Sequence, residues 1–125
     1  MSTDIRIIAA HDFIKATPEG QLDFERSRQL LVEIASAAAP LADYEIILDT
    51  RKAGTSLSET DLWYLAAELF ELRKAFLHRR TAVLCPLEQF DRAAFFALCA
   101  QNRGLEVQAF ASFEAAIEWL IGNGG

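Results

Sequence analysis

Short apolar runs with the length of β-strands recur along this chain. The run from Tyr44 to Asp49 is almost continuously apolar, which is typical of a strand covered on both faces. Two earlier runs flank the polar pair His11–Asp12, and this arrangement predicts a hairpin. We expect strands at residues 5–10, 13–17, 44–49, 81–85 and 106–110.

The segments between and after these strands carry apolar residues at helical spacing. We expect helices at about residues 23–39, 58–77, 87–102 and 112–121. Asp23, Ser58 and Ser112 are the expected N-caps, and Ser58 with Asp61 matches a capping box. Pro40 is expected to end the first helix.

The element order that follows is ββαβαβαβα. Strands that alternate with helices of this length imply parallel crossovers. We therefore predict an α/β fold with a mostly parallel sheet flanked by helices. The length of 125 residues fits one domain over residues 1–125.

Composition and charge indicate which kinds of partner and which cellular compartment to expect. Apolar residues make up 52% of the chain, enough for a hydrophobic core, and the net charge of −6 argues against nucleic acid as a partner. No apolar run approaches the roughly 20 residues of a membrane span, and the first residues lack the basic-then-apolar order of a signal peptide. Cys85 and Cys99 form no disulfide framework, so we expect a cytoplasmic protein with reduced thiols.

Candidate catalytic groups do not form a recognisable motif. His11 and His78 have no second ligand at metal spacing, and the glycines form no phosphate-binding loop. Cys85 and Cys99 fit buried apolar positions better than reactive thiols. We predict a protein that is not an enzyme and that uses no cofactor and no metal.

Basic and aromatic residues suggest surfaces for partners. The pairs Arg73–Lys74 and Arg79–Arg80 follow the long second helix, where cations complement the helix dipole, although an anion or a partner is an alternative. The aromatic residues are more than one sheet face is expected to cover, and the group comprises Trp63, Phe70, Phe95 and Trp119. We expect a symmetric homodimer through them, with ordinary scattered exposure as the alternative.

Three segments resemble the SpoIIAA-like family, a branch of the STAS-type fold. The first is Gly20 with Phe24, and the second is Ile46–Asp49 followed by Arg51. The third is the closing segment Phe113–Leu120, which ends in a Trp-Leu pair. The resemblance covers nearly the whole chain and implies four or five strands with helices mostly on one face.

The resemblance also implies a regulatory role. Anti-sigma factor antagonists of this fold bind a partner kinase and are switched by phosphorylation of a serine where the helix after the central strand begins. Ser58 lies at such a helix start, nine residues after Asp49, and Thr55 and Ser56 in the same loop are further candidates. The family carries an Asp-Ser-Ser-Gly run there, whereas this chain reads Leu57-Ser58-Glu59-Thr60.

The expected interaction surface comprises two aromatic residues and two basic residues that would approach a phosphate in this loop: Trp63, Phe70, Arg51 and Lys52. The expected partner is a protein or a second copy of the chain. The family also resembles the lipid-binding CRAL-TRIO fold, so a carrier of a small apolar ligand is the alternative function.

Overall fold

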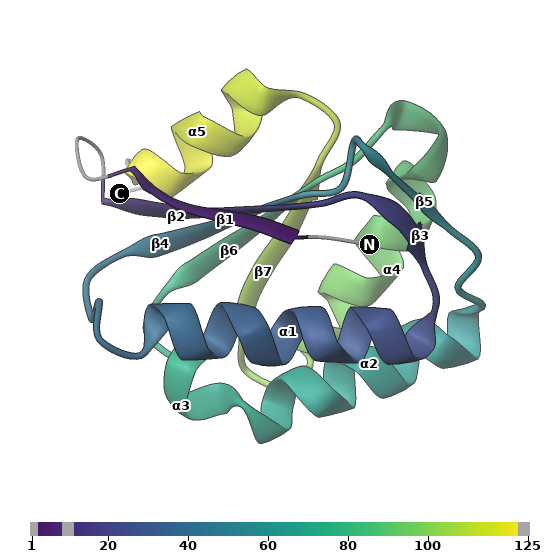
Figure 1. Ribbon diagram of the computed structural model, residues 1–125, viewed down its shortest axis with the longest axis horizontal. Helices are drawn as coiled ribbons and strands as arrows, with labels where there is room; N and C mark the ends of the chain where they lie inside the picture. The colour runs from purple at the N-terminus through teal and green to yellow at the C-terminus, as the bar shows by residue number, and fades with distance from the viewer. Residues whose placement is uncertain (1–2, 9–11, 123–125) are drawn as a thin grey trace.

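Five strands form one mixed sheet in the computed structural model, which describes residues 3–8 and 12–122 (Figure 1). The strands are ordered β1-β2-β4-β6-β7 across the sheet. The outer strand β1 pairs antiparallel with β2, and every later pair is parallel. Their bounds are Thr3–Ile8, Phe13–Pro18, Glu45–Asp49, Arg80–Leu84 and Glu106–Phe110. The predicted α/β class with a mostly parallel sheet is confirmed.

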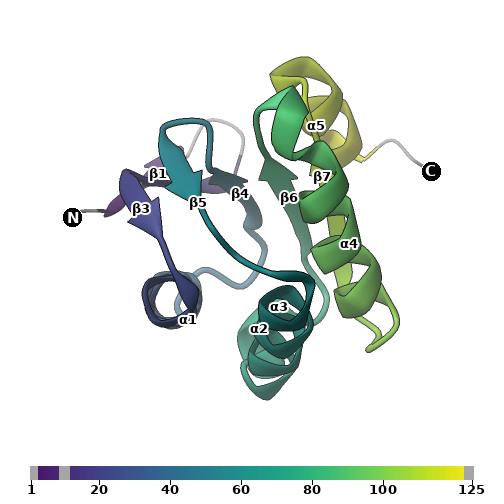
Figure 2. The same ribbon diagram turned by 90° about the vertical axis from the view of Figure 1, so that its right-hand side faces the viewer.

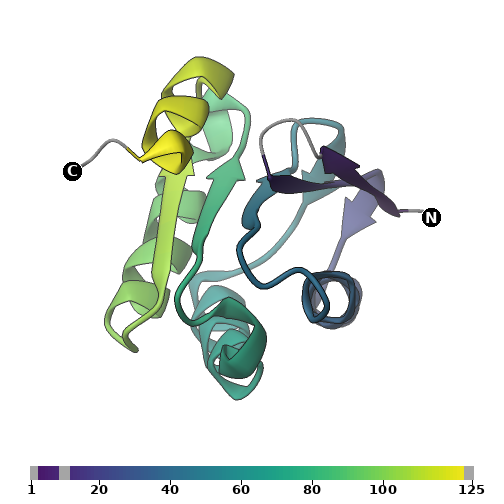
Figure 3. The ribbon, with the colours of Figure 1, turned by 90° about the vertical axis from the view of Figure 1, so that its left-hand side faces the viewer.

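The helices cover the two faces of the sheet unequally (Figures 1 to 3). Helices α1 (Phe24–Ala38), α2 (Glu59–Glu71), α3 (Arg73–Phe76) and α4 (Phe90–Gln101) lie on one face. Among the described helices, only α5 (Phe113–Ile121) packs on the opposite face. No helix in residues 3–8 and 12–122 is long and apolar enough to cross a membrane.

The middle of strand β4, from Ile46 to Leu48, is apolar because it contributes to a core on each face. Ile46 and Leu48 belong to the large core beneath α1, α2 and α4. Ile47, between them, packs with Phe13 and Ala82 in the smaller core beneath α5. Alternate side chains of a strand point to opposite faces, so Asp49 follows Ile47 toward the α5 face.

The hairpin of β1 and β2 is confirmed by its antiparallel register, in which Ile8 lies opposite Phe13. Asp12 has a φ of 56°, in the left-handed region that tight turns use. His11 and the expected strand residues 9 and 10 lie outside the described residues.

Two short strands were not predicted. β3 (Gly20–Leu22) and β5 (Ala53–Thr55) pair parallel as a separate two-stranded ribbon, with Gly20 opposite Ala53. Gly20 has a φ of 85°, so it supplies the left-handed conformation after β2. Three residues with little β-branched or aromatic content give no strand signal in the sequence.

The predicted helix over residues 58–77 is divided in the structure. The backbone leaves helical geometry at Leu72, where φ is −98° and ψ is 19°, and the short helix α3 follows. A 3-10 turn, η2 (Leu87–Gln89), also precedes α4 within the predicted helix over 87–102. The other helix bounds agree with the prediction to within a few residues.

The basic residues after α2 do contact helix ends, but two of them serve helices far away in the sequence. Arg73 donates to the Phe70 carbonyl of α2, as its place in the sequence indicates. Arg80 instead donates to the Trp119 carbonyl of α5. Arg79 is 7% exposed and turns toward the end of α1. Its guanidinium donates to three carbonyls, those of Ala38, Leu41 and Tyr44.

The expected excess of aromatic surface is smaller than the sequence indicates. Phe70 and Phe95 are partly buried against the large core, and Trp119 packs against the smaller core beneath α5. The expectation assumed a single covered sheet face, whereas α5 covers the second face. Trp63 is the member of this group that stays largely exposed, at 46%.

Candidate functional site

The candidate site lies where the parallel strands end and residues 50–58 connect β4 to α2. The carboxyl ends of parallel strands are the usual ligand-binding edge of an α/β sheet. Thr50 fixes the start of this connection, because its backbone N–H (2.8 Å) and its hydroxyl (3.1 Å) both donate to the Leu84 carbonyl of β6. The connection is therefore tied to the neighbouring strand.

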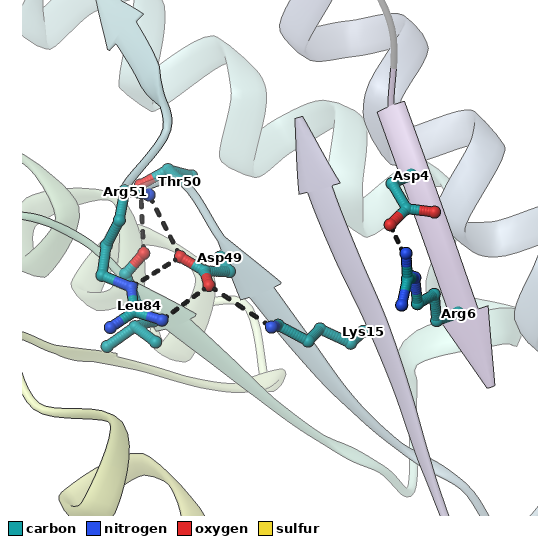
Figure 4. Close-up of polar contacts among 7 residues, drawn as sticks. All are labelled: Asp4, Arg6, Lys15, Asp49, Thr50, Arg51 and Leu84. Carbon is teal, nitrogen blue, oxygen red and sulfur yellow. Dashed lines mark hydrogen bonds and ion pairs between the residues drawn. The ribbon is translucent and has the colours of Figure 1, made fainter. Parts of the chain in front are cut away.

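A buried carboxylate organises the end of β4 (Figure 4). Asp49 is 4% exposed and accepts hydrogen bonds from Arg51 Nε at 3.0 Å and Nη2 at 2.9 Å. The Arg51 backbone N–H donates to the same carboxylate at 3.1 Å, and Lys15 Nζ of β2 lies 3.7 Å from it. The Phe113 ring at the start of α5 lies about 6 Å from both cations.

These contacts keep Asp49 ionised. Burial by itself raises the pKa of Asp49, but the hydrogen bonds from Arg51 and the charges of Arg51 and Lys15 outweigh it, so the pKa lies below its ordinary value. The hydrogen bond to Asp49 in turn raises the pKa of the Arg51 guanidinium. A carboxylate held in this state is a poor proton donor at neutral pH, so the cluster suits positioning better than acid catalysis.

Ser58 begins α2 with the capping box that the sequence predicts. Its hydroxyl accepts from the Asp61 backbone N–H at 3.0 Å, and the Asp61 carboxylate accepts from the Ser58 backbone N–H at 3.0 Å. Ser58 is exposed, so its hydroxyl is accessible to a modifying enzyme. The other two candidates differ: Ser56 is exposed, whereas the Thr55 hydroxyl is partly buried and accepts from the Leu57 backbone N–H.

We predict that Ser58→Ala lowers the free energy of unfolding by about 1 kcal/mol, because the first turn of α2 loses its side-chain acceptor. Urea denaturation followed by circular dichroism measures the change. Ser56→Ala is the matched control in the same loop, and we expect no more than a few tenths of a kcal/mol there. Equal losses in both variants would contradict the capping role of Ser58.

The structure does not gather the four expected interaction residues into one surface. Arg51 is held on Asp49 at the α5 face, and Lys52 is exposed in the turn that follows. Trp63 lies on α2 with its ring 5.2 Å from the Arg103 guanidinium. Phe70, two turns further along α2, is covered by Arg73 at 4.6 Å.

A different basic residue contacts the segment before Ser58. Arg92, in the first turn of α4, donates from Nη1 to the Leu57 carbonyl. The sequence places Arg92 34 positions after Ser58, so spacing alone gives no sign of this contact. Arg92 rather than Arg51 is therefore the cation that the structure ties to the start of α2.

An apolar pocket of about 100 Å³ lies beneath the β3–β5 ribbon, and the sequence analysis missed it. It is bounded by α1, α2, α4 and the sheet face that carries Leu48 and Val83. Most of its lining residues are aliphatic or aromatic, including Leu22, Leu30, Leu57, Leu62, Leu65 and Phe96. These residues come from core positions of several elements that are distant in the sequence, so no local motif marks the pocket.

Two further candidate groups show no catalytic arrangement. Burial raises the pKa of the Cys85 thiol, which lies 3.6 Å from the Phe110 carbonyl, so the nucleophilic thiolate is disfavoured. Cys99 is partly buried on α4. Within the described ranges, no group of three or more histidine, cysteine, aspartate or glutamate side chains has a geometry that could hold a metal ion.

Comparison with solved structures identifies the fold. One match is an uncharacterised DUF3478-family protein with a SpoIIAA-like fold from Shewanella loihica, with a TM-score of 0.58 and 19% identity over 95% of this chain and 92% of that one. Another is the anti-sigma factor antagonist SpoIIAA in its unphosphorylated form, with a TM-score of 0.57 and 18% identity over 97% and 99% of the two chains. No protein-family model and no curated protein sequence matches this chain.

Proposed function

We propose that this chain, which has a SpoIIAA-like fold, is a non-enzymatic regulatory module that acts by binding a protein partner. The observation that carries the proposal is the likeness over nearly the whole chain to an anti-sigma factor antagonist. We place the module in the cytoplasm, because Cys85 and Cys99 are both free thiols and reducing compartments maintain that state.

The proposed partner contact is the α2 surface, which we define as Ser58, Trp63 and Tyr64. All three residues are exposed in the first half of α2. The rings of Trp63 and Tyr64 stand edge to face with centroids 5.2 Å apart, and Arg103 stacks on Trp63. Exposed aromatic residues beside an arginine are the composition typical of binding hot spots. A second copy of the chain would use the same surface to form a homodimer.

The proposed switch is a phosphate on Ser58. It would add up to about two negative charges where a helix begins, and the helix dipole favours negative charge there. Arg92 already contacts the adjacent Leu57 and would complement the phosphate. Asp61 opposes it, because its carboxylate accepts from the Ser58 backbone N–H and would face the new charge. The modification would therefore disturb the capping box and the α2 surface together.

Affinity capture from the source cells tests this function. We expect the wild-type chain and Ser58→Ala to retain one specific protein, and Ser58→Asp to retain at least about tenfold less, because the added charge alters the α2 surface. Ser36→Asp on the exposed side of α1 is the matched control and should capture like the wild type. Phosphopeptide mapping of the native protein shows whether Ser58, Ser56 or Thr55 carries the phosphate. Equal capture by all four proteins, with no phosphate found, would rule out the switch.

The second candidate function is carriage of a small apolar ligand, and the apolar pocket favours it. A carrier needs an apolar space that is separate from the charged cluster at Asp49. The pocket meets this need, because it faces α1, α2 and α4 while Asp49 faces α5. Native mass spectrometry of the purified chain tests the function through the mass of any co-purified ligand.

A further inference from the structure

We propose that the apolar pocket binds a small uncharged molecule with one hydrogen-bonding group, and that this group is held by the Ser27 hydroxyl. The inference deepens the second candidate function and rests on it. It specifies the size and charge of the ligand and the protein group that forms a hydrogen bond with it, where the second candidate function names only a small apolar ligand.

The lining determines the charge of the ligand. Of the described residues that line the pocket, only Arg92 is charged, and its guanidinium already donates to the Leu57 carbonyl. The buried charges of the Asp49 cluster face the other side of the sheet. A charged group inside the pocket would lose its hydration without a counter-ion, so a neutral ligand is favoured.

Ser27 supplies the polar contact. It lines the pocket from α1 and is 7% exposed. Its backbone N–H donates to the Asp23 carbonyl at 2.9 Å, but no group within the described ranges forms a hydrogen bond with its Oγ. A buried hydroxyl without a partner is costly, and buried polar side chains almost always have one. A hydroxyl or carbonyl on a bound ligand would satisfy it.

The volume limits the size of the ligand. A cavity of about 150 Å³ lined by aliphatic and aromatic side chains is known to admit benzene. The pocket here, at about 100 Å³, is smaller than that and well below the range of drug-sized sites. It therefore fits a short alkyl group or a single small ring.

Benzene and phenol are the probes that separate the apolar contact from the hydrogen bond. We would titrate each into the ¹⁵N-labelled chain and follow amide chemical shifts. Both should bind the wild type saturably, with the largest shifts around the pocket. Ser27→Ala should weaken phenol about threefold to tenfold, the worth of one hydrogen bond, while benzene stays within about twofold.

Filling the pocket is the second arm of the test. Ala93 lines the pocket on α4, whereas the neighbouring Ala94 does not. Ala93→Leu should weaken both probes by more than about tenfold, because the larger side chain occupies the space. Ala94→Leu, the matched control, should bind both as the wild type does.

Three results would overturn the inference: no saturable shifts with either probe, binding unaffected by Ala93→Leu, or equal losses of benzene and phenol in Ser27→Ala. A long-chain lipid found by native mass spectrometry, together with no binding of either probe, would support the carrier function and reject the short ligand. If no lipid is found and neither probe binds, the carrier function is rejected as well. The proposed binding of a protein partner is independent of both results.

Discussion

Arg79→Met is expected to lower the free energy of unfolding by about 1.5–3 kcal/mol, the range for losing hydrogen bonds from a charged donor. The Arg79 guanidinium is buried and donates to the carbonyls of Ala38, Leu41 and Tyr44 at 3.2, 3.1 and 2.9 Å. These carbonyls end α1 and lead into β4, so the side chain joins three elements of the fold. Methionine removes the charged donor from all three carbonyls; those of Ala38 and Leu41 keep only the backbone N–H groups of Leu41 and Tyr44 as donors.

Urea denaturation of three variants measures this effect. Arg73→Met is the matched control, because Arg73 also donates to a helix-end carbonyl but is exposed, and we expect a loss below about 1 kcal/mol. Arg79→Lys should lie between the two, since an ammonium group cannot reproduce the planar fork of donors. Equal losses for Arg79→Met and Arg73→Met would refute the structural role of Arg79.

Asp49→Asn is expected to lower the free energy of unfolding by about 1–2 kcal/mol at pH 7. The expected loss is kept to this range because the Arg51 side chain is half exposed, and solvent weakens its ion pair with Asp49. The pKa of Asp49 is lowered in the folded state, because the hydrogen bonds from Arg51 outweigh the effect of burial. A carboxyl group of this kind stabilises the fold at pH values above its unfolded pKa. The contribution is lost as the pH falls through the folded pKa.

The difference between wild type and Asp49→Asn should therefore be complete at pH 7 and shrink once the pH falls below about 4. Denaturant unfolding at several pH values gives both curves. Asp4→Asn is the control, since Asp4 pairs with Arg6 on the exposed face of β1 and should change stability by no more than about 0.5 kcal/mol (Figure 4). A difference for Asp49→Asn that stays constant from pH 7 to pH 3 would contradict the ion pair.

Local patterns predict much of this fold. The apolar runs place β2, β4, β6 and β7, and the caps at Asp23, Ser58 and Ser112 begin their helices as expected. Each of these signals lies within a few residues of the feature that it determines. The resemblance to SpoIIAA-like proteins adds the correct fold, which the solved structures support.

Features built from distant segments were missed. The β3–β5 ribbon joins Gly20 to Ala53, and Arg79 reaches a carbonyl 41 residues earlier. The apolar pocket draws its lining from many helices and strands and from the loops between them, and most of these residues have the pattern of ordinary core positions. A sequence shows that such residues are buried, but the neighbours they meet depend on the order of strands in the sheet.

In the candidate site, too, the sequence predicts features set by neighbouring residues and misses contacts between distant segments. The capping box at Ser58 follows from four consecutive residues and is present in the structure. The expected approach of Arg51 to this loop is not seen, because Arg51 finds a closer acceptor in Asp49 two residues away. The basic residue that contacts this loop is instead Arg92, which donates to the Leu57 carbonyl. This contact depends on the packing of α4 beside α2.

Site-specific photo-crosslinking in the source cells tests the central claim most directly, namely that this chain acts by binding a protein partner through the α2 surface. A photoreactive phenylalanine analogue would replace Trp63, and in a second protein Glu118 on the exposed side of α5. We predict one discrete cross-linked product from position 63 that contains a different protein, and none of that product from position 118. A chain that cross-links only to itself, or to the same proteins from both positions, would contradict the claim.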